Sequence, residues 1–142
     1  FVNQGPGNFS GLRGSLAIAK GISLSKNLDL FGFNTFIWSC AELIKKKKLI
    51  CSIIKFREKY YIKKFNPGLK GRFEVKEISE NEILRKYDKM DKVIPKKLVS
   101  SFSDKILKLN NLSIVELDHN VLELLQIKGL LNKGLIRPLY LN

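Results

Sequence analysis

The sequence predicts an α/β protein in which helices and short strands alternate along the chain. Apolar residues recur at helical spacing over residues 10–25, and two β-rich segments, 49–56 and 59–65, follow each other with a two-residue connection. The 142 residues suffice for one hydrophobic core. An apolar share of 44% beside 27% charged residues is typical of a globular chain and excludes a disordered tail.

The first third of the chain predicts two strands and two helices. Residues 1–3 are typical of a strand end that runs into the turn Gly5-Pro6-Gly7. Ser10 is expected to cap a helix to residue 25, whose small residues allow another backbone to approach closely. A short strand over 28–33 follows, and Asn34 or Thr35 is expected to cap a helix that ends in the lysine run 45–48.

The remaining elements follow from turn and capping signals. We expect a hairpin from the two β-rich segments, a third strand over 72–78, and a helix to about residue 89 opened by Ser79-x-x-Glu82. Residues 93–108 fit either a strand or a helical turn. Ser113-x-x-Glu116 predicts a long helix to about residue 132, stopped by Gly134, before a last strand over 139–141.

Several classes of protein are excluded or disfavoured. No apolar run approaches the ~18 residues that a membrane span needs. Cys40 and Cys51 lie in apolar surroundings without a paired-cysteine motif, so a reducing cytoplasm is expected. His119 is the only histidine and is expected on a helix surface. Neither Asp29 nor Glu42 has an acidic partner for acid–base work, so the residues do not predict an independent enzyme.

Positive charge is concentrated in one stretch of the chain. The net charge is +13, and residues 45–72 hold eleven basic residues against one acid, Glu58, a local balance of +10. Lys45, Lys46, Lys47 and Lys48 are therefore candidates to face RNA. A solvated surface in a lysine-rich protein is the competing interpretation.

The most distinctive motif is Gly5-Pro6-Gly7-Asn8-Phe9-Ser10-Gly11-Leu12-Arg13. A glycine turn before a helix can bind an anion, or it can serve close packing. The motif resembles the Gly-Pro-Gly-Ser-Phe-Thr-Gly-Leu-Arg signature of the TsaB (YeaZ) family, with Asn8 in place of Ser and Ser10 in place of Thr. Ala17-x-Ala19-Lys20-Gly21, Gly32-x-x-Thr35 and Pro138-x-Tyr140-Leu141 extend the resemblance along the chain.

The resemblance implies an actin/hexokinase-like (ribonuclease H-like) fold, with mixed sheets flanked by helices in two related halves. Residues 1–48 would be the remainder of the first half, and 49–142 the second half. The family's first strands would precede Phe1, so the first half is expected to be incomplete. The chain departs from the family's pattern at Gly14-Ser15, at Ile54, where the family has Asp, and at Glu58, where it has Gly.

The family's role implies a non-catalytic dimerisation subunit for transfer of a threonylcarbamoyl group to the adenosine next to the tRNA anticodon. The implied partners are a TsaD-like catalytic paralogue, a TsaE-like ATPase and, indirectly, tRNA, with a homodimer when the paralogue is absent. ATP and metal would bind to the partner subunits and no cofactor to this one. The helix after the glycine turn would form the interface, through Leu12, Leu16, Ala19 and Lys20.

Two alternatives come from other classes of function. The chain could be the catalytic, metal-binding paralogue of the TsaD type or a stand-alone sugar-kinase-like enzyme, although Phe9, Ser10 and Arg13 fit the dimerisation subunit better. A plain RNA-binding module would rest on the basic stretch alone, because no RNP-like strand, KH loop or zinc knuckle accompanies it.

Overall fold

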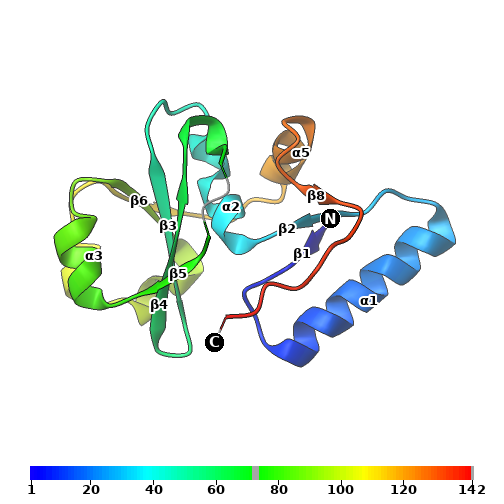
Figure 1. The fold of residues 1–142 in the computed structure, drawn as a ribbon, viewed down its shortest axis with the longest axis horizontal. Coiled ribbons are helices and arrows are strands. Elements are labelled where there is room, and N and C mark those ends of the chain that lie inside the picture. Colours follow the sequence, from blue (N-terminus) through cyan, green and yellow to red (C-terminus); the bar gives the residue numbers. More distant parts are fainter. Residues whose placement is uncertain (72–73, 142) are drawn as a thin grey trace. The chain divides into compact units, whose positions relative to one another are not determined.

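The computed structural model describes residues 1–71 and 74–141 (Figure 1). Its helices are α1 (Phe9–Lys26), α2 (Thr35–Cys40), α3 (Glu80–Lys86), α4 (Asp104–Leu107) and α5 (Asn120–Ile127). Its strands are β1 (Val2–Asn3), β2 (Phe31–Phe33), β3 (Ile50–Phe56), β4 (Lys59–Phe65), β5 (Lys76–Ile78), β6 (Asp91–Pro95), β7 (Leu112–Val115) and β8 (Asn132–Lys133). The predicted α/β class is therefore confirmed.

The chain forms two compact units. Unit 1 combines Phe1–Trp38 with the segment from His119 to the C-terminus, and unit 2 is Ser39–Asp118. These units do not follow the expected boundary between residues 48 and 49, because β8, near the end of the chain, pairs with β2. The assignment of 1–48 and 49–142 to the two halves of an actin-like fold stays a prediction.

Unit 1 is built on a small sheet in the order β1-β2-β8. Strands β1 and β2 are parallel, and β2 and β8 are antiparallel. Its core joins Val2 from β1, Leu16 from α1 and Ile136 from the C-terminal segment. The expected strand over 139–141 does not form, but the Leu139 amide still donates to the Gln4 carbonyl at 2.6 Å.

The N-cap of helix α1 lies two residues before the predicted cap Ser10. The Asn8 side chain accepts a hydrogen bond from the Gly11 amide at 2.6 Å, so Asn8 is the N-cap and Ser10 lies in the first turn. The helix ends at Lys26, and its C-cap Asn27 adopts the left-handed conformation (φ 50°) and donates its amide to the last turn. The turn and helix were predicted correctly, but the capping residue was not.

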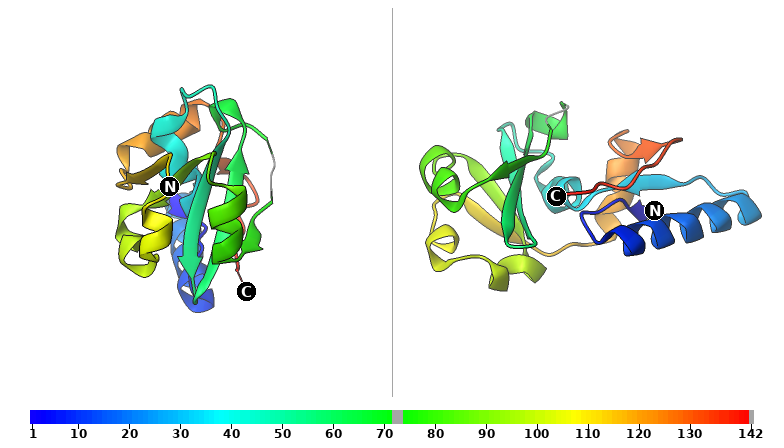
Figure 2. Two further views of the ribbon diagram at one scale, coloured as in Figure 1. Left: turned by 90° about the vertical axis from the view of Figure 1, so that its left-hand side faces the viewer. Right: turned by 60° about the horizontal axis from the view of Figure 1, so that its bottom comes forward.

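Unit 2 contains a five-stranded mixed sheet in the order β5-β4-β3-β6-β7. The hairpin β3–β4 and the pair β4–β5 are antiparallel, whereas β3–β6 and β6–β7 are parallel. Helices α3 and α4 lie over one face of this sheet (Figure 2). On this face, Ile83 and Ile106 pack on Ile53, Ile62 and Ile94. A mixed sheet flanked by helices is the arrangement that the actin-like resemblance implies.

The hairpin and the capping box at Ser79 confirm the local predictions, although α3 ends at Lys86 rather than near residue 89. Arg57 and Glu58 both have positive φ (49° and 62°), which gives the tight two-residue connection between β3 and β4. Ser79 caps α3 by accepting a hydrogen bond from the Glu82 amide. The third strand of the sheet, β5, covers only the end of the predicted range 72–78, whose first two residues lie outside the described part.

The second predicted capping box is wrong. Ser113 lies within strand β7, opposite Val93 of β6, because parallel pairing of the segment outweighs its local capping pattern. The helix starts later, at Asn120, and ends at Ile127 before Gly129, whose φ is 70°, rather than at residue 132 before Gly134. Residues 93–108 contain both expected alternatives, strand β6 followed by a 3-10 segment (Lys96–Ser101) and α4.

Candidate partner interface

The glycine turn brings the start of the chain against its end. Gly5 has φ of 114°, and a side chain on it would come within 2.9 Å of the Leu139 carbonyl oxygen. Beside it, the Gln4 side-chain amide donates to the Arg137 carbonyl at 2.7 Å. Gly7 follows Pro6 and lies against the Leu12 side chain. These contacts support the packing interpretation of the motif, since its glycines allow close approach of backbone and side chains.

Aromatic stacking joins the first turn of α1 to the C-terminal segment. The ring of Phe9 stacks on that of Tyr140, with 5.2 Å between the centroids. The Arg13 guanidinium also lies over the Phe9 ring, 4.4 Å from its centroid. Phe9 is 53% exposed and Tyr140 42% exposed, so this stack lies at the surface of unit 1. The motif residues Phe9 and Arg13 therefore form one stacked cluster with Tyr140.

The inner face of α1 belongs to the core of unit 1. Leu12 and Leu16 are buried, and Ala19 packs against the cluster of Val2, Leu16 and Ile136. Of the contacts expected from the resemblance, only Lys20 is exposed. A charged substitution at Ala19 would therefore disturb the fold of unit 1 as well as any interface.

The opposite face of the same helix consists of apolar and small residues, and no other described part of the chain covers it. Ile18 is 67% exposed and Ile22 53% exposed, although both are large aliphatic residues. A side chain added at Gly14 or Gly21 would meet no atom within 4 Å. We call Gly14, Ile18, Gly21 and Ile22 the outer face of α1. The sequence shows that these residues recur at helical spacing. Only the structure shows that the face with Leu12 is buried and that the outer face is exposed.

All charges on α1 are positive. The helix carries Arg13, Lys20 and Lys26 and has no acidic residue. Arg13 and Lys20 also line a groove of about 540 Å³ between α1 and the C-terminal segment, together with Arg137 and Tyr140. A surface of this kind attracts an acidic partner.

The other sequence candidates are dispersed. Lys45, Lys46, Lys47 and Lys48 are exposed in the segment before β3. Asp29 makes an ion pair with Lys133 at 3.1 Å, and Glu42 is exposed in the 3-10 segment Ala41–Leu43. His119 directly precedes α5, exposed as predicted, with its ring edge-on to Trp38 at 5.2 Å.

Cys40 and Cys51 are both buried free thiols. Burial raises the pKa of Cys40 to about 12 and that of Cys51 to about 11, so neither is a reactive thiolate at neutral pH. Residues 1–71 and 74–141 hold no group of three or more His, Cys, Asp or Glu side chains that could bind a metal ion. Within the same ranges, none of the helices has both the length and the apolar character that crossing a bilayer requires.

Comparison with known proteins gives matches at the level of structure. No protein-family model and no curated protein matches the sequence. YeaZ from Pseudomonas aeruginosa superposes with a TM-score of 0.59 over 96% of this chain and 71% of its own, at 10% sequence identity. The chain has a YeaZ-like fold. An uncharacterised protein with similarity to peptidase YeaZ, also from Pseudomonas aeruginosa, gives a TM-score of 0.58 over 99% of this chain and 71% of its own, at 14% identity.

The YeaZ-like fold confirms the expected architecture of mixed sheets flanked by helices. The superposition covers nearly the whole chain and therefore parts of both units. At sequence identities of 10% and 14%, these superpositions show a shared fold alone. Function therefore has to be argued from the surface of this chain.

Proposed function

We propose that this chain is a TsaB-like, non-catalytic subunit of a complex that transfers a threonylcarbamoyl group to the adenosine next to the tRNA anticodon. The observation that carries the proposal is the outer face of α1, where Ile18 and Ile22 are exposed next to two open glycines. The glycines permit another helix to approach closely, and the isoleucines supply apolar area to bury there. The YeaZ-like fold and the glycine-turn motif agree with this assignment.

The charge of α1 favours a TsaD-like paralogue over a second copy of this chain. In a symmetric pair that met along the outer face of α1, the cations that flank this face on one helix would lie near those of the other, with no acidic residue on either helix to compensate. A paralogue with acidic residues opposite Arg13 and Lys20 avoids that repulsion. We expect a homodimer only when the paralogue is absent, and expect it to weaken at low salt, where repulsion is strongest.

The chemistry would then belong to the partners. ATP would be hydrolysed by a TsaE-like subunit, and the metal and nucleotide of the transfer site would be held by the TsaD-like one. This chain would contribute the surface on which that subunit is stabilised, and it would take part in tRNA modification only as part of the complex.

Reconstitution with purified proteins tests the proposal. Unmodified tRNA and threonylcarbamoyl-adenylate are incubated with the chain alone, with the TsaD-like and TsaE-like proteins of the same organism plus ATP, and with all three. We expect modified adenosine only in the complete mixture, measured by mass spectrometry of digested tRNA. Modification by the chain alone would refute its non-catalytic role. A full rate without the chain would refute its role as a required subunit.

A further inference from the structure

The two ends of the hairpin β3–β4 carry lysines in opposite electrostatic situations. The end at the connection Arg57-Glu58 has lysines paired with carboxylates, and the other end has lysines without such partners among the described residues. Within the stretch of +10 charge, Lys55 and Lys59 at the connection end thus have carboxylate partners, whereas the lysines at the other end have none among the described residues.

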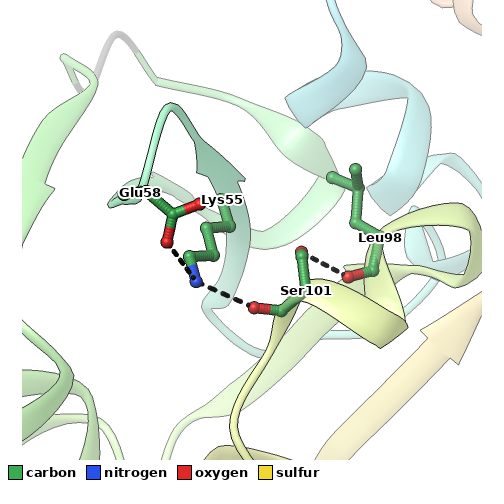
Figure 3. A network of polar contacts seen from close by, with 4 residues as sticks. All are labelled: Lys55, Glu58, Leu98 and Ser101. Carbon is green, nitrogen blue, oxygen red and sulfur yellow. Dashed lines mark hydrogen bonds and ion pairs between the residues drawn. The ribbon is translucent and has the colours of Figure 1, made fainter.

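At the connection end, each nearby lysine has a partner. Lys55 Nζ lies 3.3 Å from a Glu58 carboxylate oxygen and donates to the Ser101 carbonyl at 3.0 Å (Figure 3). Lys59 lies 3.2 Å from a carboxylate oxygen of Glu77 on the neighbouring strand. Such surface pairs add little stability, but they cancel charge locally.

The other end gathers lysines from two segments. Ile50, the first residue of β3, is opposite Phe65, the last residue of β4. This register places the run Lys45–Lys48, just before β3, at the same sheet end as the turn after β4, where the amide of Asn66 donates to the Lys70 carbonyl at 3.0 Å. We call Lys45, Lys46, Lys47, Lys48 and Lys70 the lysine end; all are exposed, and none makes an ion pair within residues 1–71 and 74–141.

Nearby carboxylates do not neutralise the lysine end. Asp91 is opposite Ile50 in the sheet, and Asp88 lies just before it, but both are next to the buried Lys92 and act on its charge. Glu42 is exposed and is the single acid between residues 30 and 57. The lysine end therefore keeps an excess of positive charge.

We propose that the lysine end binds the phosphate backbone of RNA without reading its bases. Among the described residues, Phe65 at the end of β4 and Tyr87 in the loop before β6 are 2% and 7% exposed, so their rings offer no platform for unstacked bases. Exposed lysines on short loops suit backbone phosphates, which they contact as point charges. Double-stranded RNA, such as the arms of tRNA, is therefore the favoured ligand class.

The surroundings argue against a membrane or a protein in the same place. In the part of the chain that the structure describes, every exposed large apolar side chain lies before residue 29 or after residue 113. An apolar anchor for a bilayer, or an apolar centre for a protein interface, is therefore lacking among the described residues around the lysine end. The inference rests on the proposed function for the identity of the RNA, but direct binding is measurable on this chain alone.

The test compares two fourfold variants that lose equal charge. In the first, Lys45–Lys48 are replaced by Gln; in the control, the carboxylate-paired Lys59, Lys86, Lys96 and Lys133 are replaced by Gln. Binding of the chain to a 24-base-pair RNA duplex and to a tRNA transcript is measured from about 50 to 200 mM salt. Removing one lysine–phosphate contact should reduce the slope of log K against log salt by about 0.9.

We expect the Lys45–Lys48 variant to bind at least about tenfold more weakly, with a slope reduced by about 2 to 4, and the control to stay near the wild type. Equal losses in both variants would mean non-specific attraction and would overturn the proposal. Absence of RNA binding by the wild type at the lowest salt, or preferential binding of phosphatidylserine vesicles, would also overturn it. Reconstituted modification tests the proposed function separately, so the two can fail independently.

Discussion

At the residue scale, Lys92 is the most unusual group in unit 2. Its side chain is fully buried, and Nζ donates to the carbonyls of Tyr87, Asp88 and Met90 at 2.7, 2.9 and 2.8 Å. Desolvation lowers the pKa of Lys92, while the carboxylate of Asp88 opposes that shift. The ammonium group satisfies three carbonyls of the loop between α3 and β6 and thereby holds this loop against the sheet.

Replacing Lys92 by Met should therefore be costly. The variant keeps the apolar stem but leaves three carbonyls without their donor, so we expect the free energy of unfolding to fall by about 3 kcal/mol. Urea unfolding measures this loss of free energy. The control is Lys89→Met, at an exposed position of the same loop, and its free energy of unfolding should stay within about 0.5 kcal/mol of the wild type. Equal stability of both variants would contradict the role assigned to Lys92.

The buried thiol of Cys40 predicts a loss of stability in alkali. Burial raises its pKa from 9.0 to about 12, so above pH 9 the unfolded chain loses the thiol proton while the folded chain keeps it. This contribution is complete below pH 9 and declines as the pH rises toward 12. Lys92, whose pKa is lowered in the folded chain, makes stability rise with pH instead. Because a Cys40→Ala variant keeps Lys92, this contribution cancels when the variant is compared with the wild type.

Between pH 7.5 and 10.5, the wild type should thus lose about 2 kcal/mol more than Cys40→Ala. Urea unfolding at both pH values measures the difference. Parallel pH dependence of the two proteins would show that the thiol does not contribute.

At the scale of elements, the β3–β4 connection is held in a conformation that its residues do not favour. Glu58 has a φ of 62°, which glycine adopts without steric cost. Glu58→Gly should therefore leave the free energy of unfolding unchanged or raise it by up to about 1 kcal/mol, despite losing the exposed ion pair with Lys55. The control Lys59→Gly, in the adjacent strand β4, should lower the free energy of unfolding. Thermal unfolding compares the two variants, and a loss of the same size at both positions would contradict this explanation.

Elements whose signals are local were predictable from the sequence. The hairpin, α1 and the Ser79 cap depend on neighbouring residues, and each lies where its pattern indicated. Ser113-x-x-Glu116 failed because parallel pairing with β6 decides that segment, and such pairing is not encoded near the residues themselves. The interface expected on α1 stays a prediction, but its residues Leu12 and Leu16 lie on the buried side of the helix. Which side is buried depends on Val2 and Ile136, which are distant in sequence.

At the scale of the whole molecule, the two units present different surfaces. Unit 1 presents the apolar outer face of α1, and unit 2 presents the uncompensated lysine end of its hairpin. Under the proposed function, one surface would hold the catalytic partner and the other would attract its RNA substrate. The central claim is that the outer face of α1 is where the TsaD-like partner binds.

The most direct test is the affinity of the chain for the TsaD-like protein, measured by isothermal titration calorimetry. Ile22→Glu places a charge on the outer face, whereas Ile127→Glu makes the same change at a still more exposed isoleucine of α5 in unit 1. Burying an unpaired carboxylate should weaken binding by about 30-fold or more for Ile22→Glu and leave it unchanged for Ile127→Glu. Wild-type affinity in a folded Ile22→Glu variant, or the same loss in both variants, would contradict this claim.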